Sequence, residues 1–326
     1  MHNKKNVLIT GVTGFIGSHL AKKLNELGHN VYGVTKYSSS RDMGNLKYYL
    51  SDTVLLTANI EDYYSTYNLL KSVDMDIVVH LAALSPVRDS FEKPHSYVET
   101  NINGTLNIIN AMLKLPDYTY RKFIYASTAE VYGIQEKQPI KEDAPLRPSS
   151  PYAITKAMTD MYAIMVNKVY DMNTTIMRCT NTYGRKLDSS FYIEYLVTSM
   201  LKGNKIYVGA PESIRDYMYV DDHVNAYIKA IENYDIKGEA FNFGTKNIIS
   251  NKDIAYQIAE LIGYDKRNIV VGEYPPNYPI RPLESDQPFI VLDSEKSNDI
   301  LRWTPKIKLE EGIKNVINLW KGKISL

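Results

Sequence analysis

The sequence predicts an α/β fold: a doubly wound parallel sheet with a smaller mixed α/β lobe. A short apolar segment at residues 6–10 runs into a turn with three glycines and then into a helical pattern. Apolar segments then alternate with helical patterns up to about residue 180, which is typical of a parallel sheet with helices on both faces. Beyond residue 184 this alternation fails. We therefore expect a first domain of residues 1–180, rejoined by 218–244, and a second lobe of residues 181–326.

The composition limits the classes of function. The 326-residue chain has a net charge of +1, which argues against nucleic acid or a membrane surface as its main partner. The single cysteine, Cys179, excludes a disulfide framework and a cysteine-based metal site, so we expect a reducing compartment and no metal. The opening residues do not resemble a signal peptide, and apolar runs stay short of the roughly 20 residues that span a bilayer. We expect a cytoplasmic protein.

The glycine turn is the first candidate binding element. Gly11, Gly14 and Gly17 lie three residues apart between the first strand and a helix. In a strand, turn and helix of this kind, backbone N–H groups and the helix N-terminus bind a phosphate. The turn predicts a dinucleotide-binding sheet of the Rossmann type, in which Phe15 and Ile16 join the three glycines around the cofactor.

The end of the second strand, residues 29–35, bears on which dinucleotide binds. In this fold an acidic residue there holds the ribose 2′-hydroxyl of NAD, whereas a basic residue suits the 2′-phosphate of NADP. No acid occurs before Asp42. The polar residues that precede it include Thr35, Lys36, Ser39 and Arg41. These residues favour NADP, but a solvated loop explains them as well, so NAD stays open.

The third and fourth strands bring further residues to the cofactor. Residues 54–57 end shortly before Asn59 and Ile60, which could bracket an adenine. Residues 76–83 form a continuous apolar run, as expected of a strand that is covered on both faces. His80 on this run fits a packed core histidine better than a ligand. The residues expected near the cofactor are Leu81, Ala82 and Ala83, whose small alanines allow a close approach, with Ser85 on its far side.

A tyrosine and a lysine four residues apart are the candidate catalytic pair. Tyr152 and Lys156 would share one face of a helix, and a nearby ammonium favours the phenolate, lowering the tyrosine pKa from about 10. That chemistry moves a proton on and off a sugar or alcohol oxygen. The same spacing recurs in Tyr32/Lys36, Tyr67/Lys71 and Tyr118/Lys122. Context favours Tyr152, because Pro151 suits a first helical turn and the expected strand at 121–126 ends in hydroxyl residues.

The remaining candidates lie near the second lobe. A long helix is expected at 95–115 and a sixth strand at 173–179. The proline-rich loop 134–150 is long enough to bring Tyr152 back toward the strand that ends near residue 126. Arg215 and Arg281 lie in polar, turn-rich settings, where planar guanidinium groups suit a diphosphate, although surface salt bridges explain them too.

Taken together, these segments resemble the extended short-chain dehydrogenase/reductase family, the nucleotide-sugar epimerases and dehydratases. The matching segments are 10–17, 80–83, 101–105, 127–133, 152–156, 178–184, 215–221 and 301–305. The resemblance implies that Thr128 hydrogen-bonds the sugar O4, that Tyr152 takes its proton, and that Lys156 holds the nicotinamide ribose and polarises Tyr152. It also implies that Asn181, Arg215 and Arg281 bind the diphosphate and nucleotide of the substrate, and that the protein is a homodimer.

Glu130 carries the hint about the reaction. It is similar to the glutamate with which 4,6-dehydratases take the C5 proton, and residues 33–48 are similar to the NADP-binding stretch of GDP-mannose 4,6-dehydratases. Ala129 stands where the dTDP-glucose type has an aspartate, and the segment after Tyr183 departs from the GDP-mannose type. UDP-glucuronate decarboxylases have a similar Ser-Glu-Val-Tyr-Gly segment.

We therefore expect a nucleotide-sugar 4,6-dehydratase: C4 is oxidised by hydride transfer to bound NAD(P), water leaves across C5 and C6, and the hydride returns to C6. A 4-epimerase is the first alternative, and a decarboxylase or 4-reductase is a further one. A dinucleotide-sensing regulator without turnover would not need Thr128, Tyr152 and Lys156 together.

Overall fold

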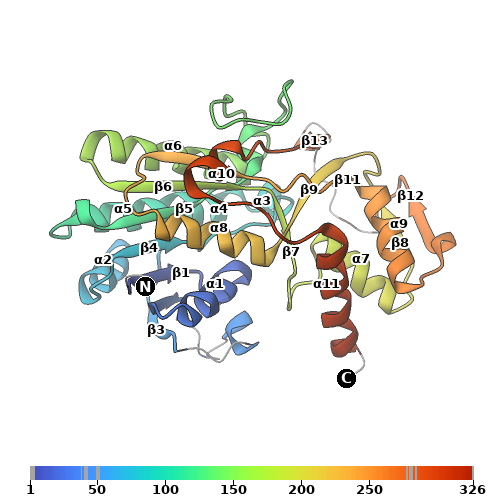
Figure 1. Ribbon diagram of the computed structural model, residues 1–326, viewed down its shortest axis with the longest axis horizontal. Coiled ribbons are helices and arrows are strands. Elements are labelled where there is room, and N and C mark those ends of the chain that lie inside the picture. The colour runs from blue at the N-terminus through green and yellow to red at the C-terminus, as the bar shows by residue number, and fades with distance from the viewer. Residues whose placement is uncertain are drawn as a thin grey trace.

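The computed structural model describes residues 4–37, 39, 43–48, 52–276, 278, 282 and 285–324. A seven-stranded parallel sheet forms the first part of the fold, in the order β10-β6-β5-β4-β1-β2-β3 (Figure 1). Its strands are β1 (Asn6–Thr10), β2 (Asn30–Thr35), β3 (Val54–Thr57), β4 (Ile77–His80), β5 (Lys122–Ala126), β6 (Asn173–Cys179) and β10 (Glu239–Phe243). The chain winds outward from β1 in both directions, which confirms the predicted α/β, doubly wound class.

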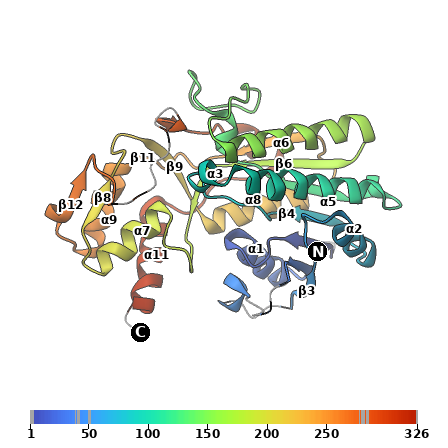
Figure 2. The same ribbon diagram turned by 180° about the vertical axis from the view of Figure 1, so that it is seen from behind.

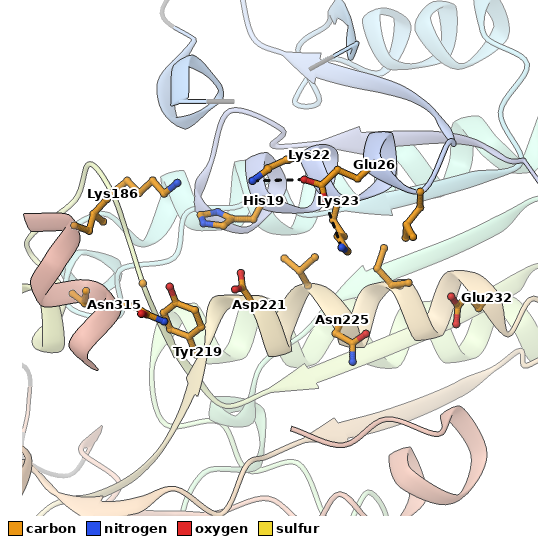
Figure 3. Close-up of a pocket in the computed structure, with 16 residues that line it drawn as sticks. His19, Lys22, Lys23, Glu26, Lys186, Tyr219, Asp221, Asn225, Glu232 and Asn315 are labelled. Atoms are coloured by element: carbon orange, nitrogen blue, oxygen red, sulfur yellow. Dashed lines mark hydrogen bonds and ion pairs between the residues drawn. The ribbon is translucent and has the colours of Figure 1, made fainter. Parts of the chain in front are cut away.

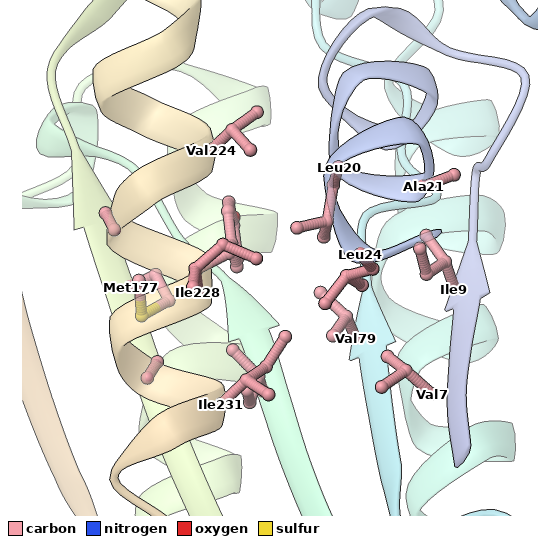
Figure 4. Close-up of a cluster of buried hydrophobic side chains, with 14 of the residues drawn as sticks. Val7, Ile9, Leu20, Ala21, Leu24, Val79, Met177, Val224, Ile228 and Ile231 are labelled. Carbon is pink, nitrogen blue, oxygen red and sulfur yellow. The ribbon is translucent and has the colours of Figure 1, made fainter. Parts of the chain in front are cut away.

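Helices cover both faces of this sheet. On one face lie α1 (Phe15–Glu26) and α8 (Val220–Glu232), and on the other lie α2 (Tyr63–Ser72), α5 (Gly104–Leu113) and α6 (Pro151–Tyr170) (Figures 1 and 2). Because successive strand residues point to opposite faces, Val7 and Ile9 pack under α1 and α8 while Leu8 packs on the other side. Figure 4 shows Leu20 and Leu24 of α1 facing α8 across this core.

The helix expected at residues 95–115 is divided into segments. It begins as α4 (Pro94–Tyr97), continues through a π-helical stretch at Val98–Asn103, and ends as α5. The short α3 (Asp89–Glu92) precedes it. Asn101 in the π-helical stretch is buried and bonds both polar groups of Leu84, with Oδ1 accepting from the N–H at 2.8 Å and Nδ2 donating to the carbonyl at 3.0 Å. The stretch thereby fixes the loop that follows β4.

The smaller lobe lies at one end of the sheet (Figure 1). One small sheet contains β7 (Asn181–Tyr183), β9 (Ile214–Tyr219), β11 (Ile248–Ser250) and β13 (Phe289–Ile290), and a second pairs β8 (Ile206–Val208) with β12 (Ile269–Val271). Their helices are α7 (Tyr192–Leu201), α9 (Asn251–Ile262) and α11 (Leu309–Ile324), and α10 (Glu295–Leu301) packs near β10. Of the described helices, none combines the length and the apolar character that a membrane crossing requires.

Candidate active site

The glycine turn brings β1, α1 and the end of β4 into close contact. Gly11 has a φ of +69°, and a Cβ there would lie 2.8 Å from the backbone nitrogen of Ala82. A Cβ at Gly17 would lie 2.3 Å from the Gly11 oxygen, so both positions require glycine. Helix α1 begins at Phe15 with the side-chain-free Gly14 at its N-cap. This open N-terminus, with the backbone of a tight turn around it, fits a dinucleotide diphosphate.

His80 supports the turn from inside the core. Its Nδ1 lies 2.7 Å from Thr10 Oγ1, and its Nε2 lies 2.9 Å from Thr105 Oγ1. Thr10 Oγ1 also accepts from the backbone N–H groups of Leu81 and Ala82, each at 3.2 Å. Burial lowers the pKa of His80 to about 3, so the ring is neutral. The expectation of a packed core histidine is confirmed.

On the adenosine side, the structure adds an acid that the sequence interpretation missed. Lys36 Nζ lies 2.9 Å from Glu61 Oε2, and Glu61 Oε1 accepts a hydrogen bond from Thr100 at 2.6 Å. The Thr100 hydrogen bond, followed by that of Lys36, lowers the pKa of Glu61. Asn59, two residues earlier, accepts from the Glu61 N–H at 3.4 Å. The sequence has no acidic residue directly after the second strand, but Glu61, which follows the third strand, lies beside Lys36 in the structure.

Of the other residues predicted for the adenosine side, Ile60 packs closely on α5. A Cβ at Gly104 would lie 2.9 Å from its Cδ1. Thr35 ends β2 and donates to the Leu56 carbonyl at 3.4 Å. Ser39 lies exposed in a turn after β2. Arg41 falls outside the described residues.

The candidate catalytic residues meet where β5 ends and α6 begins. Ser150 caps α6 by accepting from the Ala153 N–H at 3.1 Å, and Pro151 is its first residue. Tyr152 forms a side-chain hydrogen bond with Thr128, which follows β5. Lys156, one turn after Tyr152, donates from Nζ to the Ala126 carbonyl at 2.8 Å. The hydroxyl, phenol and amine thus converge as the sequence interpretation expected.

The pKa of the tyrosine differs from the expectation. Burial, followed by the charge of Glu130, raises the pKa of Tyr152, while the Thr128 hydrogen bond lowers it. Burial also lowers the pKa of Lys156 to about 7, against the opposing charge of Asp160. The prediction that Lys156 lowers the pKa of Tyr152 is therefore wrong. Desolvation disfavours the phenolate of Tyr152, and it also disfavours the ammonium of Lys156 that was expected to stabilise this phenolate.

A buried ionic network lies behind this cluster. Asp160, one turn beyond Lys156, accepts from Ser127 Oγ at 2.7 Å and from Arg178 Nε and Nη2 at 2.9 and 2.8 Å. Arg178 Nη1 donates to the hydroxyl of Tyr132 at 2.8 Å. Because Ser127 and Tyr132 flank Thr128 and Glu130, the network fixes the segment that carries both of these residues.

The substrate-side candidates line one cavity of about 570 Å³. Ser85, Glu130, Asn181 and Arg215 all contribute to its wall, with aromatic side chains from the smaller lobe. Arg215 Nη2 forms an ion pair with Asp286 at 2.9 Å. Arg281 falls outside the described residues. Glu130 is the member of the catalytic group that reaches this wall, so it joins the Tyr152 cluster to the cavity.

The comparisons with known proteins agree with this geometry. Residues 8–316 match the family described as GDP-mannose 4,6 dehydratase. The chain belongs to the extended short-chain dehydrogenase/reductase family. A UDP-glucose 4-epimerase of Lactobacillus helveticus is 30% identical over 339 residues, covering 97% of this chain and 96% of that protein.

Solved structures of the family share the whole architecture. The UDP-glucose 4-epimerase of Thermotoga maritima, determined with UDP-glucose, has a TM-score of 0.86 and 31% identity, and the match covers 98% of this chain and 99% of that one. The dTDP-glucose 4,6-dehydratase of Bacillus anthracis, in complex with NAD, has a TM-score of 0.84 and 26% identity, covering 98% of each chain. The resemblance inferred from the sequence segments is confirmed.

Two further residues of this family member escaped the sequence interpretation. Gln287 is fully buried and donates from Nε2 to the carboxylate of Glu130. Arg185, after β7, stacks on Phe15 and Phe191. Gln287 is 157 residues from Glu130 in the chain, so no local spacing could link the two. Arg185 directly follows Gly184 in the sequence, but it was not predicted as a site residue.

A separate hollow of about 630 Å³ lies between α1 and α8, near α11. Figure 3 shows Lys22 and Lys23 of α1 near Glu26, Lys186 at one end of the hollow, and Asp221 of α8 facing α1. None of the predicted site residues contributes to it. Convergence of the candidate residues therefore places the candidate active site in the cavity that Glu130 lines.

Proposed function

We propose that this protein is a nucleotide-sugar 4,6-dehydratase that uses a bound nicotinamide dinucleotide. The observation that carries the proposal is the placement of Glu130: its carboxylate lines the cavity shared by Asn181 and Arg215, and its charge acts on Tyr152. A carboxylate at this point can act as a base and remove a proton from a carbon that has become acidic beside a ketone. A bound nicotinamide would supply reversible hydride transfer, with the hydride accepted from C4 and returned to C6.

The chain's own residues would manage the protons. Tyr152 takes the proton of the sugar O4, and Thr128, already hydrogen-bonded to Tyr152, orients that hydroxyl. Lys156, one helical turn from Tyr152, holds the nicotinamide ribose. Glu130 takes the C5 proton and passes it to the C6 hydroxyl, which leaves as water. C5 then takes a proton from solvent when C6 is reduced. Asn181, Arg215 and Arg281 bind the diphosphate and nucleotide, and Ser85, which also lines the cavity, contacts the sugar. Arg215 would share its guanidinium between Asp286 and the substrate.

The cofactor would lie on the glycine turn, with Leu81, Ala82 and Ala83 beside it and Asn59 and Ile60 near the adenine. We assign NADP as the preferred form because Lys36 carries a positive charge that suits a 2′-phosphate. Its side chain is 65% exposed, so it can leave its ion pair with Glu61 and bind this phosphate instead. Glu61 supports the alternative, NAD, because its carboxylate suits a ribose 2′-hydroxyl. Residues 1–180 with 218–244 would hold the cofactor, and residues 181–326 the nucleotide sugar.

A 4-epimerase is the second candidate, favoured by a specific observation. Relatives that match nearly the whole chain, from L. helveticus and T. maritima, are UDP-glucose 4-epimerases. The deciding experiment incubates the protein with UDP-, GDP-, CDP- and dTDP-sugars in the presence of NADP or NAD. Loss of water in the mass of one product supports the dehydratase. A product of unchanged mass with inverted C4, seen by NMR, supports the epimerase instead.

The surface of α6 supports a homodimer. Ile154, Met158, Met161 and Val169 follow a helical spacing and are 54%, 38%, 54% and 62% exposed. An apolar stripe of this kind suits a second copy of the chain. Light scattering should give twice the chain mass, and a single chain mass would remove this part of the proposal.

The buried Cys179 fits a cytoplasmic location.

A further inference from the structure

Arg185 lies between the glycine turn and the substrate cavity. Its Cζ is 4.5 Å from the ring centroid of Phe15 and 3.4 Å from that of Phe191. Phe15 is the first residue of α1, directly after the turn, and Phe191 lines the cavity that contains Glu130 and Arg215. The guanidinium therefore stands at the point where the two proposed ligand sites meet.

The guanidinium of Arg185 is stacked but has an unsatisfied donor. Its Nε is buried, and no acceptor among the described residues meets it. The nearest carboxylates serve other donors: Glu194 Oε1 accepts from the N–H groups of Gly184 and Arg185 at 2.7 and 2.9 Å, and Asp188 Oδ1 accepts from Ser190. Burial lowers the pKa of Arg185, with Glu194 and Asp188 opposing it. A desolvated charge with an open donor calls for a partner of opposite charge.

We propose that Arg185 binds a diphosphate group, either that of the dinucleotide on the glycine turn or that of the nucleotide sugar in the cavity. The inference rests on the proposed function, because it takes both ligands from there. A planar guanidinium offers paired donors that match phosphate oxygens, and two aromatic faces hold its plane in one orientation. Glu194 accepts hydrogen bonds from the backbone of this loop, and these bonds fix the position of Arg185 before a ligand binds.

The test measures binding rather than turnover. The probes are NADP, NAD, UDP and dTDP, titrated by calorimetry into the wild type, Arg185→Gln and Arg185→Lys. We expect Arg185→Gln to weaken either the dinucleotides or the nucleoside diphosphates by about 10- to 100-fold, as for a lost charge-assisted hydrogen bond in a buried site. Arg185→Lys keeps the charge but loses the fork, so a smaller loss is expected. The class of probe that weakens identifies which diphosphate Arg185 holds.

Lys186→Gln is the matched control, because it removes one positive charge at the next position. Lys186 lines the separate hollow beside α1 and α8 (Figure 3). Unchanged binding of every probe by both Arg185 variants, or equal losses in Lys186→Gln, would overturn the inference. If Arg185→Gln does not fold, Arg185→Lys decides by itself. Wild-type protein that binds no probe would overturn the proposed function and the inference together, whereas a normal wild type with unaffected variants overturns the inference alone.

Discussion

Gln287 Nε2 lies 3.3 Å from Glu130 Oε2 and 3.4 Å from the Glu130 carbonyl oxygen. One buried amide therefore donates to both the side-chain carboxylate and the backbone carbonyl of the proposed base. The side chain of Gln287 is fully buried, and its Oε1 has no hydrogen-bond partner among the residues that the structure describes. A carboxylate held in this way keeps its orientation without help from a substrate. Gln287 is therefore a positioning residue for Glu130.

Gln287→Glu should shift the pH dependence of turnover. A second carboxylate next to Glu130 disfavours its ionised form, which raises the pKa of Glu130 and moves the acid limb of kcat/KM to higher pH. Gln287→Met is the control, because it removes the hydrogen bonds without adding a charge. We expect it to lower kcat and to move the limb less than Gln287→Glu does, because it loses only the hydrogen bond to the carboxylate. Identical pH profiles for the wild type and Gln287→Glu would show that Gln287 does not act on the base.

Glu130→Gln separates the dehydratase from the epimerase. The amide keeps the shape of the side chain but cannot accept the C5 proton. Water loss should stop, while reduced nicotinamide still forms transiently and absorbs near about 340 nm. Exchange of the C5 hydrogen with deuterated solvent should stop as well. If the wild type inverts C4 without any C5 exchange, and Glu130→Gln does so equally well, the dehydratase assignment is wrong and the epimerase replaces it.

Tyr152→Phe should lower turnover by about 10²- to 10⁴-fold, the usual contribution of general acid/base catalysis, with little effect on substrate binding. The ring stays, so packing against Tyr97, whose ring centroid lies 6.3 Å away, is preserved. Tyr67→Phe is the control, because Tyr67 and Lys71 repeat the spacing on α2 without a Thr128 neighbour. Full activity of Tyr152→Phe would remove Tyr152 from the mechanism.

The fold could be predicted because its signals are local. An apolar run, a glycine turn and a helical period each need only a few neighbouring residues, and β1 with α1 shows all three. Tyr152 and Lys156 could be predicted because four residues on a helix fix their relation. The pair Lys36 and Glu61 could not, since they are 25 residues apart and meet only when β2 and β3 align. Burial is also a property of the folded whole, so the pKa of Tyr152 could not be inferred from the spacing.

Lys36→Ala tests the cofactor preference. If Lys36 pairs with a 2′-phosphate, its loss should weaken NADP by about tenfold or more and leave NAD nearly unchanged, as for one lost charge-assisted contact. Glu61→Gln should act in the opposite sense, weakening NAD and favouring NADP, because it removes the carboxylate that competes for Lys36. Fluorescence titration of the wild type and both variants with NADP and NAD gives the six affinities. Equal affinities in the wild type, or equal losses in Lys36→Ala, would leave no ground for an NADP preference.

Lys156 should make the stability of the fold depend on pH. Burial lowers its pKa to about 7 in the folded chain, whereas an unfolded lysine has a pKa near about 10.4. Between these values the unfolded state binds one more proton than the folded state. The free energy of unfolding therefore rises with pH in this window, by up to about 1.4 kcal/mol per pH unit. Below about pH 7 both states are protonated and the slope disappears.

Lys156→Met removes this titration and keeps a side chain of similar length. Urea unfolding of the wild type and the variant from pH 7.5 to 9.5 should show the wild type gaining stability relative to Lys156→Met as the pH rises. Lys168→Met, an exposed position of the same helix α6, should leave the slope unchanged. Parallel stability curves for the wild type and Lys156→Met would mean that the Lys156 amine keeps its proton in the folded chain.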